Sequence, residues 1–580
     1  MAIKMAIKNF TGPKSIIIYT ALLLTVFIFS SVAYSVQLPG QLQSGSVLNS
    51  QKNKKNKLLK KTLPFPIIKK AQPEKPGSIP NGKSFLVKGF KFEGNSVIKT
   101  FVLMRLVSKF ENKNLYLKDI YKITDIISDY YHKQGYFLAK AYLPPQQVKN
   151  GIVIIKIIEG HLEKIKVEGE KFYKPGFIRD NINATNKGVI RYSALLKSLY
   201  LLNEYHDLSV RALLVKGSEP GTTDIIAKVK DTDPFHAYVD YDNFGSRYIS
   251  ANSAGVGIEK GNIISDGDYF TVQYDLGFPF KTSQYYDINY STPLGDYGTK
   301  LDVSYLYSNF MATGQYGSLG IKGRAEMWNA DVTYPILRTR RSSLNFIAGF
   351  SRESLYNYIL GTISSHDEIR PLSVGFAGNY ADVLGNTFFS ANLTHGITGI
   401  FGGSKNGNPY ASYFGAEYNF YVLNLNAERV QRFFWNTFFL LKASAQLSDV
   451  TLPVAQKMSI GGEGSVRGYP VSQDMGDSGY TGSIEYRIPP PFISGLAIKN
   501  RKIGSMVQLL GFVDYGRVFS RDVLSGGAPN SQLAGTGGGI RLNLPGGLKA
   551  AFDIGFPIGT NRPYDSSSYM TYFSLEEKFF

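Results

Sequence analysis

The chain of 580 residues is too long for one small domain, so its length predicts several units. It contains no cysteine, which excludes disulfides, thiolate metal sites and cysteine nucleophiles, and it is rich in tyrosine, phenylalanine and glycine. The formal net charge is +19, but the excess of lysine and arginine lies in the first 231 residues, whereas residues 232–580 are nearly neutral. No nucleic-acid-binding signature accompanies the basic region, so we expect a basic soluble module, with no nucleic-acid partner, ahead of a neutral β-domain.

Residues 1–35 have the pattern of a secretory signal peptide. Three lysines precede an apolar run over residues 16–29, and small residues around Ala33 suit a cleavage site. A transmembrane anchor is the alternative, but the apolar run is short for a membrane span. We therefore expect export with cleavage.

Residues 36–83 are rich in lysine and interrupted by proline. A basic helix over residues 48–63 is expected, and the prolines from Pro64 to Pro80 would stop it and stiffen a linker. Disorder is the alternative reading of the same composition.

Two units of about 70 residues follow, at residues 84–160 and 161–231. In each, the alternation of apolar residues predicts the order strand, helix, helix, strand, strand. This internal repeat predicts two small α+β domains.

Residues 232–580 show alternating apolar and polar positions in sixteen segments, from residues 236–245 to residues 569–579. The tenth predicted segment is Ala411–Leu423. An even number of such segments predicts a closed 16-stranded antiparallel transmembrane β-barrel, in which the carboxylates inside the segments, Glu485 and Asp553 among them, would face a polar lumen. A soluble β-sandwich is the structural alternative.

A glycine-rich loop over residues 461–470 contains one arginine, Arg467. It could be a surface turn, or it could fold inward so that Arg467 meets a carboxylate in the barrel wall. Asp514 is the candidate because it lies in an apolar, aromatic strand, where an unpaired charge would be costly.

These two stretches resemble a known superfamily. Val466, Arg467, Gly468 and Tyr469 resemble the loop motif of the Omp85 superfamily. Phe512, Asp514 and Gly516 resemble the strand motif that receives its arginine. The branch that the chain most resembles is the two-partner secretion transporters. The resemblance implies an inward-folding loop locked by Arg467 and Asp514, and a plug helix within residues 36–83.

The two α+β units resemble POTRA domains. The residues that match the first POTRA domain of these transporters are Gly135, Tyr136, Leu143, Pro144, Gln146 and Gly160, and those that match the second are Pro220, Gly221 and Asp224. All of them could equally be packing and turn residues of an α+β fold.

The end of the chain is similar to the aromatic strand that outer-membrane insertion machinery recognises. The residues concerned are Phe573, Leu575, Phe579 and Phe580. If the odd-numbered ones face lipid, so does Glu577, which is tolerable only near the membrane interface.

The resemblance implies an outer-membrane transporter of Gram-negative bacteria with its POTRA domains in the periplasm. It would secrete a large unfolded partner of the haemolysin, adhesin or toxin type by two-partner (type V) secretion. An outer-membrane protein assembly factor of the same superfamily is the alternative; a passive porin or an adhesin would explain less of the chain. Histidines at metal-ligand spacing, a nucleophile elbow and a P-loop are all missing from the sequence, so we expect neither an enzyme nor a cofactor or metal.

Overall fold

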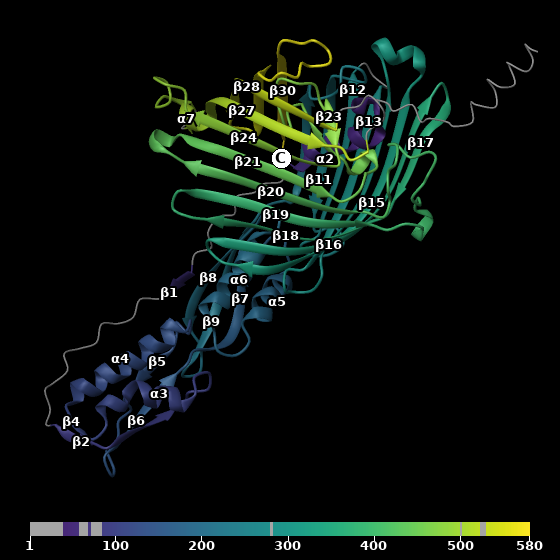
Figure 1. Ribbon diagram of the computed structural model, residues 1–580. Helices are drawn as coiled ribbons and strands as arrows, with labels where there is room; N and C mark the ends of the chain where they lie inside the picture. The colour runs from purple at the N-terminus through teal and green to yellow at the C-terminus, as the bar shows by residue number, and fades with distance from the viewer. Residues whose placement is uncertain are drawn as a thin grey trace, which may run out of the picture.

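The computed structural model describes residues 39–56, 68–70, 84–278, 282–498, 501–522 and 529–579. A β-barrel forms one part of the molecule, two small α/β units extend from one of its ends, and a short helix lies inside it (Figure 1). We call the end of the barrel that carries the small units the near rim and the opposite end the far rim. The signal peptide expected over residues 1–35 lies outside the described residues, and so does Phe580.

The first small unit is built on a three-stranded sheet with the order β3-β6-β5. Its apolar residues recur every three or four positions along the longer helix, where Ile120, Ile123 and Ile127 are fully buried. Its elements are β2 (Phe85–Val87), β3 (Gly89–Glu93), α3 (Thr100–Val107), β4 (Lys113–Leu115), α4 (Leu117–Lys133), β5 (Lys140–Tyr142) and β6 (Ile152–Ile158).

The second unit has a four-stranded sheet with the order β1-β8-β9-β7. Its elements are β7 (His161–Glu168), α5 (Pro175–Thr185), α6 (Tyr192–Asn203), β8 (Leu208–Lys216) and β9 (Thr222–Asp231). The fourth strand, β1 (Ile68–Lys70), belongs to the linker that precedes the first unit. It pairs in parallel with β8, with Ile68 opposite Ala212, and so occupies an edge of this sheet.

The remaining strands close an antiparallel barrel, because β10 pairs with β30. The strand β16 pairs with β17 at one end and with β18 at the other. We therefore count β17 and β18, which are separated by Arg370, as one of the sixteen barrel strands, and we call these sixteen strands the staves. The predicted fold class, two POTRA-like units and a 16-stranded barrel, is confirmed. The staves are β10 (Phe235–Asp242), β11 (Asn252–Gly261), β12 (Tyr269–Phe278), β13 (Ser283–Pro293), β14 (Lys300–Met311), β15 (Lys322–Arg338), β16 (Ser342–Ile359), β17 (Thr362–Ile369) with β18 (Pro371–Ala381), β19 (Gly385–Gly396), β20 (Tyr421–Arg432), β21 (Phe438–Ser448), β24 (Ser478–Ile488), β27 (Val507–Phe519), β28 (Asn530–Asn543), β29 (Leu548–Pro557) and β30 (Met570–Lys578).

One predicted strand, Ala411–Leu423, is misplaced, because only its last three residues belong to a strand. The tenth stave is β20, and residues 411–420 form part of a loop whose side chains Tyr413, Tyr418 and Phe420 are buried in a lumenal apolar cluster. Their alternation reflects burial inside the barrel rather than a lipid-facing strand. The true strand was less conspicuous because several of its residues are polar or charged.

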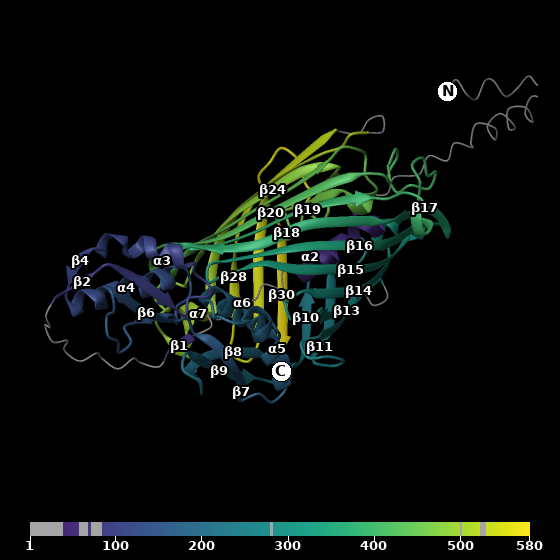
Figure 2. The same ribbon diagram turned by 90° about the horizontal axis from the view of Figure 1, so that it is seen from below.

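A helix, α2 (Ser44–Asn56), lies in the lumen and begins four residues before the predicted start at residue 48; residues 57–63 lie outside the described residues (Figures 1 and 2). Leu48 packs into the apolar cluster that includes Leu452 and Val454. The Asn49 side chain donates a hydrogen bond to the Ala455 carbonyl at 2.7 Å. Gly45 allows this approach, because a Cβ there would lie 2.7 Å from the Ala455 Cα.

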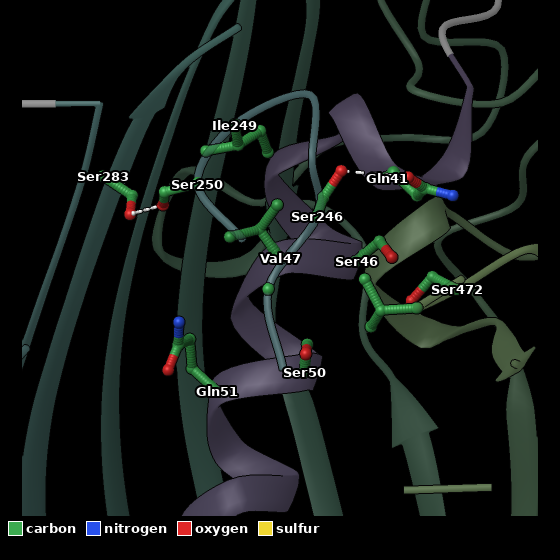
Figure 3. Close-up of a pocket in the computed structure, with 12 residues that line it drawn as sticks. Gln41, Ser46, Val47, Ser50, Gln51, Ser246, Ile249, Ser250, Ser283 and Ser472 are labelled. Atoms are coloured by element: carbon green, nitrogen blue, oxygen red, sulfur yellow. Dashed lines mark hydrogen bonds between the residues drawn. The ribbon is translucent and has the colours of Figure 1, made fainter. Parts of the chain in front are cut away.

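The other side of α2 meets the wall through small polar side chains. Ser46, Ser50 and Gln51 line a small cavity together with Ser246, Ser250 and Ser283 (Figure 3). Within the described residues, the buried atoms Ser44 Oγ, Ser46 Oγ and Gln51 Oε1 have no hydrogen-bond partner. Burying polar atoms without partners is costly, so these three atoms weaken the seating of α2 in the lumen.

Ionic contacts join the second unit to one arc of the near rim. Glu204, just after α6, accepts hydrogen bonds from the guanidinium of Arg338 at the end of β15, one of them at 3.2 Å. Lys174 and Asp266 form a weaker pair at 3.7 Å, and the Lys300 ammonium lies 4.9 Å from the centre of the Tyr205 ring. These contacts fix the second unit beside the turns that connect β11 to β12, β13 to β14 and β15 to β16.

The described part of the chain contains no helix that is long and apolar enough to cross a membrane.

Candidate functional site

The glycine-rich loop folds into the barrel from the far rim. It is carried by a hairpin of β22 (Met458–Ile460) and β23 (Asp474–Gly476), which pack against the inner faces of β27 and β28. Gly461 and Gly462 have φ angles of 106° and 92°, where a side chain would be strained. Ile460, Val466 and Tyr469 bury their side chains against Val518 and Leu533 of the wall.

The tip of this loop places Arg467 on Asp514. The Arg467 Nε and Nη2 atoms donate to the two carboxylate oxygens of Asp514 at 2.7 and 3.0 Å, and the Arg467 backbone N–H donates at 3.1 Å. This fork-to-fork geometry is the strongest arrangement that an arginine and a carboxylate form. Both side chains are almost completely withdrawn from water, with 6% and 1% of their surface exposed.

Arg467 meets two further carboxylates. Its Nη1 atom donates to Glu485 on β24 at 3.0 Å and to Asp553 on β29 at 3.1 Å. Its guanidinium carbon lies 3.4 Å from the centre of the Phe512 ring, close enough for a cation–π contact. One arginine therefore contacts three strands of the wall.

Two more arginines complete the network. Arg487 donates to Glu485, and Arg541 donates to Asp553 through both terminal nitrogens. Three guanidinium groups thus face three carboxylates. This balance matters because a buried charge with no partner costs several kcal/mol.

Glycines in the wall let the loop backbone come close. A Cβ at Gly535 would lie 1.8 Å from the Arg467 carbonyl oxygen, and one at Gly555 would lie 2.6 Å from the Gly468 nitrogen. The Tyr572 hydroxyl accepts from the Gly468 N–H at 3.1 Å and donates to the Tyr469 carbonyl at 2.9 Å. The loop therefore lies against the wall through its backbone as well as through Arg467.

The predicted loop and strand residues meet at this one place. A Cβ at Gly516 would be 3.0 Å from Val466, so Gly516 provides space for the loop, and the Tyr469 hydroxyl donates to the Asn561 carbonyl at 3.0 Å. Sequence reasoning placed Glu485 and Asp553 in the lumen but did not connect them with Arg467. It missed the roles of Tyr572, Gly535 and Gly555, because only strand register shows that these residues share one patch of wall.

The POTRA motif residues lie apart from this cluster and build the small units. The Gln146 amide donates to the Ile154 carbonyl and accepts from the Ile154 N–H, at 2.7 and 2.8 Å, as a neighbouring strand would. Asp224 accepts from the Lys164 N–H at 3.1 Å. Other motif residues serve turns and packing: Gly135, Gly160 and Gly221 have positive φ angles, Tyr136 and Leu143 pack against the first core, and Pro144 and Pro220 lie in loops.

A buried, hydrogen-bonded carboxylate stabilises the first unit. Glu159, which is 2% exposed, accepts hydrogen bonds from the N–H groups of Ser96 and Val97 and from the Tyr131 hydroxyl at 2.8 Å. Burial, followed by the adjacent Glu159 carboxylate, raises the pKa of Tyr131. Tyr131 therefore acts as a structural donor in this unit.

The aromatic C-terminal strand forms the closing seam of the barrel. Leu575 and Phe579 are exposed on its outer face, and Phe573 lies 6.1 Å from Tyr241 of β10, measured between ring centres. Glu577 is half-buried and pairs with Leu548, at the near-rim end of β29. This position at the barrel end suits a charged side chain.

Comparisons with known proteins give a consistent result. The family model described as haemolysin secretion/activation protein ShlB/FhaC/HecB matches residues 221–542, and a POTRA domain of ShlB type matches residues 85–160. The heme/hemopexin transporter protein HuxB of Haemophilus influenzae (strain 86-028NP) is 24% identical over 472 residues, covering 80% of this chain and 82% of the relative. The outer membrane transporter CdiB of Escherichia coli O6:K15:H31 (strain 536 / UPEC) is 22% identical over 415 residues, covering 69% of this chain and 68% of the relative.

Solved structures show the same fold. CdiB from Escherichia coli superposes with a TM-score of 0.74 at 18% identity, covering 92% of this chain and 98% of that structure. CdiB from Acinetobacter baumannii superposes with a TM-score of 0.68 at 16% identity, covering 93% and 99%.

We predict that Arg467→Ala lowers the thermal stability of the folded barrel, because it leaves three carboxylates short of one cation at a cost of about 3–5 kcal/mol. Arg467→Lys keeps the positive charge but loses the forked hydrogen bonds to Asp514, so its thermal stability should lie between those of Arg467→Ala and the wild type. The measurement is the temperature at which the barrel loses its heat-modifiable migration on a gel. Arg517→Ala, which removes an arginine outside this network on β27, is the matched control. Equal melting of Arg467→Ala and wild type would refute the prediction.

Gly535→Ala should displace the loop without removing any charge, because the new methyl group would collide with the Arg467 carbonyl. We expect a spin label at Glu463 to become more mobile in this variant. Gly511→Ala is the control, since the nearest atom to a Cβ there is 3.9 Å away. If the electron paramagnetic resonance spectrum of the label is the same in Gly535→Ala and in the protein with Gly535, the wall glycine does not constrain the loop.

Proposed function

Because the chain belongs to the haemolysin secretion/activation protein family ShlB/FhaC/HecB, we propose that its POTRA units capture a large client protein in unfolded form and pass it to the barrel. The protein is an outer-membrane transporter of two-partner secretion, with its POTRA domains in the periplasm. The near rim is therefore periplasmic and the far rim extracellular. The client would be of the haemolysin, adhesin or toxin type.

The observation that carries the capture step is the position of β1. A sheet edge can accept an extended peptide as an added strand, through backbone hydrogen bonds that require no particular side chains. The linker strand already occupies the β8 edge of the second POTRA unit in this way, through only three residue pairs. An unfolded client segment that pairs with more of β8 would displace β1.

Displacement of β1 would act directly on the plug. The helix α2 ends at Asn56 and β1 begins at Ile68, so the two are joined by residues 57–67. A client that releases β1 frees this tether and lets α2 move. The partnerless hydroxyls of Ser44 and Ser46 make the helix inexpensive to withdraw.

In the proposed mechanism, Arg467 and Asp514 hold the loop against the wall while the plug leaves. The Val466–Tyr469 backbone lies against β28 and β29 and is hydrogen-bonded to Tyr572 of β30, so this side of the lumen would keep its shape. A rigid side wall and a removable plug give the client one defined path. Nucleotide has no role in it, since capture and folding of the client outside would supply the driving force.

The outer surface and the last strand support the remaining proposals. Exposed apolar side chains on the outer faces of β24, β27 and β30, including Ile484, Val513 and Leu575, would contact outer-membrane lipid. Phe573, Leu575 and Phe579, together with Phe580, would be recognised by the barrel-insertion machinery during biogenesis.

The experiment that tests the function is a deletion of residues 84–231, with the partner protein in the medium and the barrel in the outer membrane both measured. We expect the partner to be lost from the medium while the barrel is still inserted. Unchanged secretion together with a general fall in other outer-membrane proteins would support an assembly factor instead.

Replacing both Lys69 and Lys70 with proline should weaken the pairing of β1. Of two consecutive residues in an edge strand, one points its N–H at the neighbour, and proline cannot donate. We expect tighter binding of an unfolded client fragment in equilibrium titrations. The double alanine variant, which keeps both N–H groups, should bind as wild type does; equal affinity of the proline and alanine variants would contradict the competition between β1 and client.

A further inference from the structure

Two neighbouring turns of the periplasmic rim take no part in the mechanism above. One connects β20 to β21 at residues 433–437, and the other connects β24 to β27 at residues 489–506. They lie side by side because β21 pairs with β24, with Phe438 opposite Arg487. We call the residues Phe433, Phe434, Trp435, Phe492, Ile493 and Leu496 of these turns the rim patch.

The rim patch exposes its largest side chains almost completely. Trp435 is 90% exposed and Phe492 is 102% exposed. Both have left-handed backbones, with φ angles of 53° and 67°. This conformation is strained for a residue with a side chain, and an exposed ring in water gains no burial that would offset the strain. Such strain is typical of a segment shaped for an external contact.

The rim patch continues onto the outer wall of the barrel. The Phe433 ring lies 4.6 Å from that of Phe434 and 5.9 Å from that of Phe439, and Phe439 lies 4.7 Å from Tyr486, all between ring centres. Further along the same strands, Leu425 and Ile484 are 40% and 56% exposed on the surface that the bilayer covers. The patch is thus an extension of the lipid-facing surface.

The charge around the patch is mainly positive, since the carboxylate on the adjacent turn, Asp382, is paired with Arg429 at 2.9 Å. Arg432, Arg501 and Lys502 are exposed beside it. The sequence has no aspartate or glutamate within residues 429–442 or 489–506. Aromatic side chains with flanking cations are typical of the membrane interface, where the cations meet anionic headgroups.

The patch also lies on the arc that the second POTRA unit leaves uncovered. That unit contacts the turns around Asn262, Asp266 and Arg338, on the other side of the barrel from β20–β27. In Figure 1, the turn that carries α7 (Ile503–Met506) lies at the end of β24 and β27, apart from the second unit.

We propose that the rim patch inserts into the headgroup region of the inner leaflet and fixes to lipid the arc of the periplasmic mouth that POTRA 2 does not cover. The partner is a phospholipid surface, with a preference for anionic headgroups. Client polypeptide, which would also suit an apolar surface, is the competing occupant.

The chain has two tryptophans, which makes the test direct. Trp328→Phe leaves Trp435 as a single reporter in the full-length protein, reconstituted in vesicles of phosphatidylethanolamine and phosphatidylglycerol. We expect blue-shifted emission, stronger quenching by bromines near the headgroup end of the acyl chain than by bromines deep in it, and protection from aqueous iodide. Trp435→Phe leaves Trp328, which is 53% exposed on the outer wall, as a reporter of lipid contact.

Emission of Trp435 typical of water, with quenching by iodide and none by brominated lipid, would overturn the proposal. A shift that occurs only when an unfolded client fragment is added would also overturn it and assign the patch to the client. The Arg501→Gln/Lys502→Gln variant should lose the increase in lipid quenching that phosphatidylglycerol produces, and retention of that increase would refute the preference for anionic lipid. None of these readouts depends on secretion, so they are independent of the proposed transport function.

Discussion

The guanidinium group of Arg467 is the contact on which the inside of this barrel depends. It joins the tip of the loop to β24, β27 and β29, and so fixes the hairpin that carries the loop. The segments around that hairpin form the seat of the plug, since Leu48 packs on Leu452 and Val454 and Asn49 bonds to Ala455. The ion-pair network around Arg467 therefore also supports the seat of the plug. In the proposed mechanism both are used, because the wall would stay fixed while the plug leaves.

The choice of arginine follows from the number of carboxylates. A guanidinium group can donate to several acceptors at once in a fixed plane, and it also stacks on the Phe512 ring. Asp514 takes two of its donors, leaving Nη1 for Glu485 and Asp553, whose other oxygens are met by Arg487 and Arg541. An ammonium group could match the charge of Arg467 but not this geometry.

The sequence was sufficient for the architecture, since alternation predicts strands and sixteen staves were expected. It was also sufficient to suggest the pair Arg467 and Asp514, because a lone acid in an aromatic strand needs a partner. It could not predict that Glu485, Asp553 and Tyr572 converge there, because that depends on the register of strands far apart in the chain. It failed at residues 411–420, where side chains buried in the lumen alternate as those of a membrane strand do. The three-residue strand β1 is too short for any periodic signal.

The position of α2 constrains the order in which the molecule can be made. The helix lies near the start of the chain, yet its contacts, such as that of Ser44 with Asn357, are with residues that are synthesised much later. Its seat does not exist until the barrel strands have paired and the hairpin has folded inward. During assembly, either the barrel strands close around the helix, or the barrel closes first and the helix enters its lumen afterwards. If the barrel closes first, its lumen lacks the plug until α2 reaches its seat.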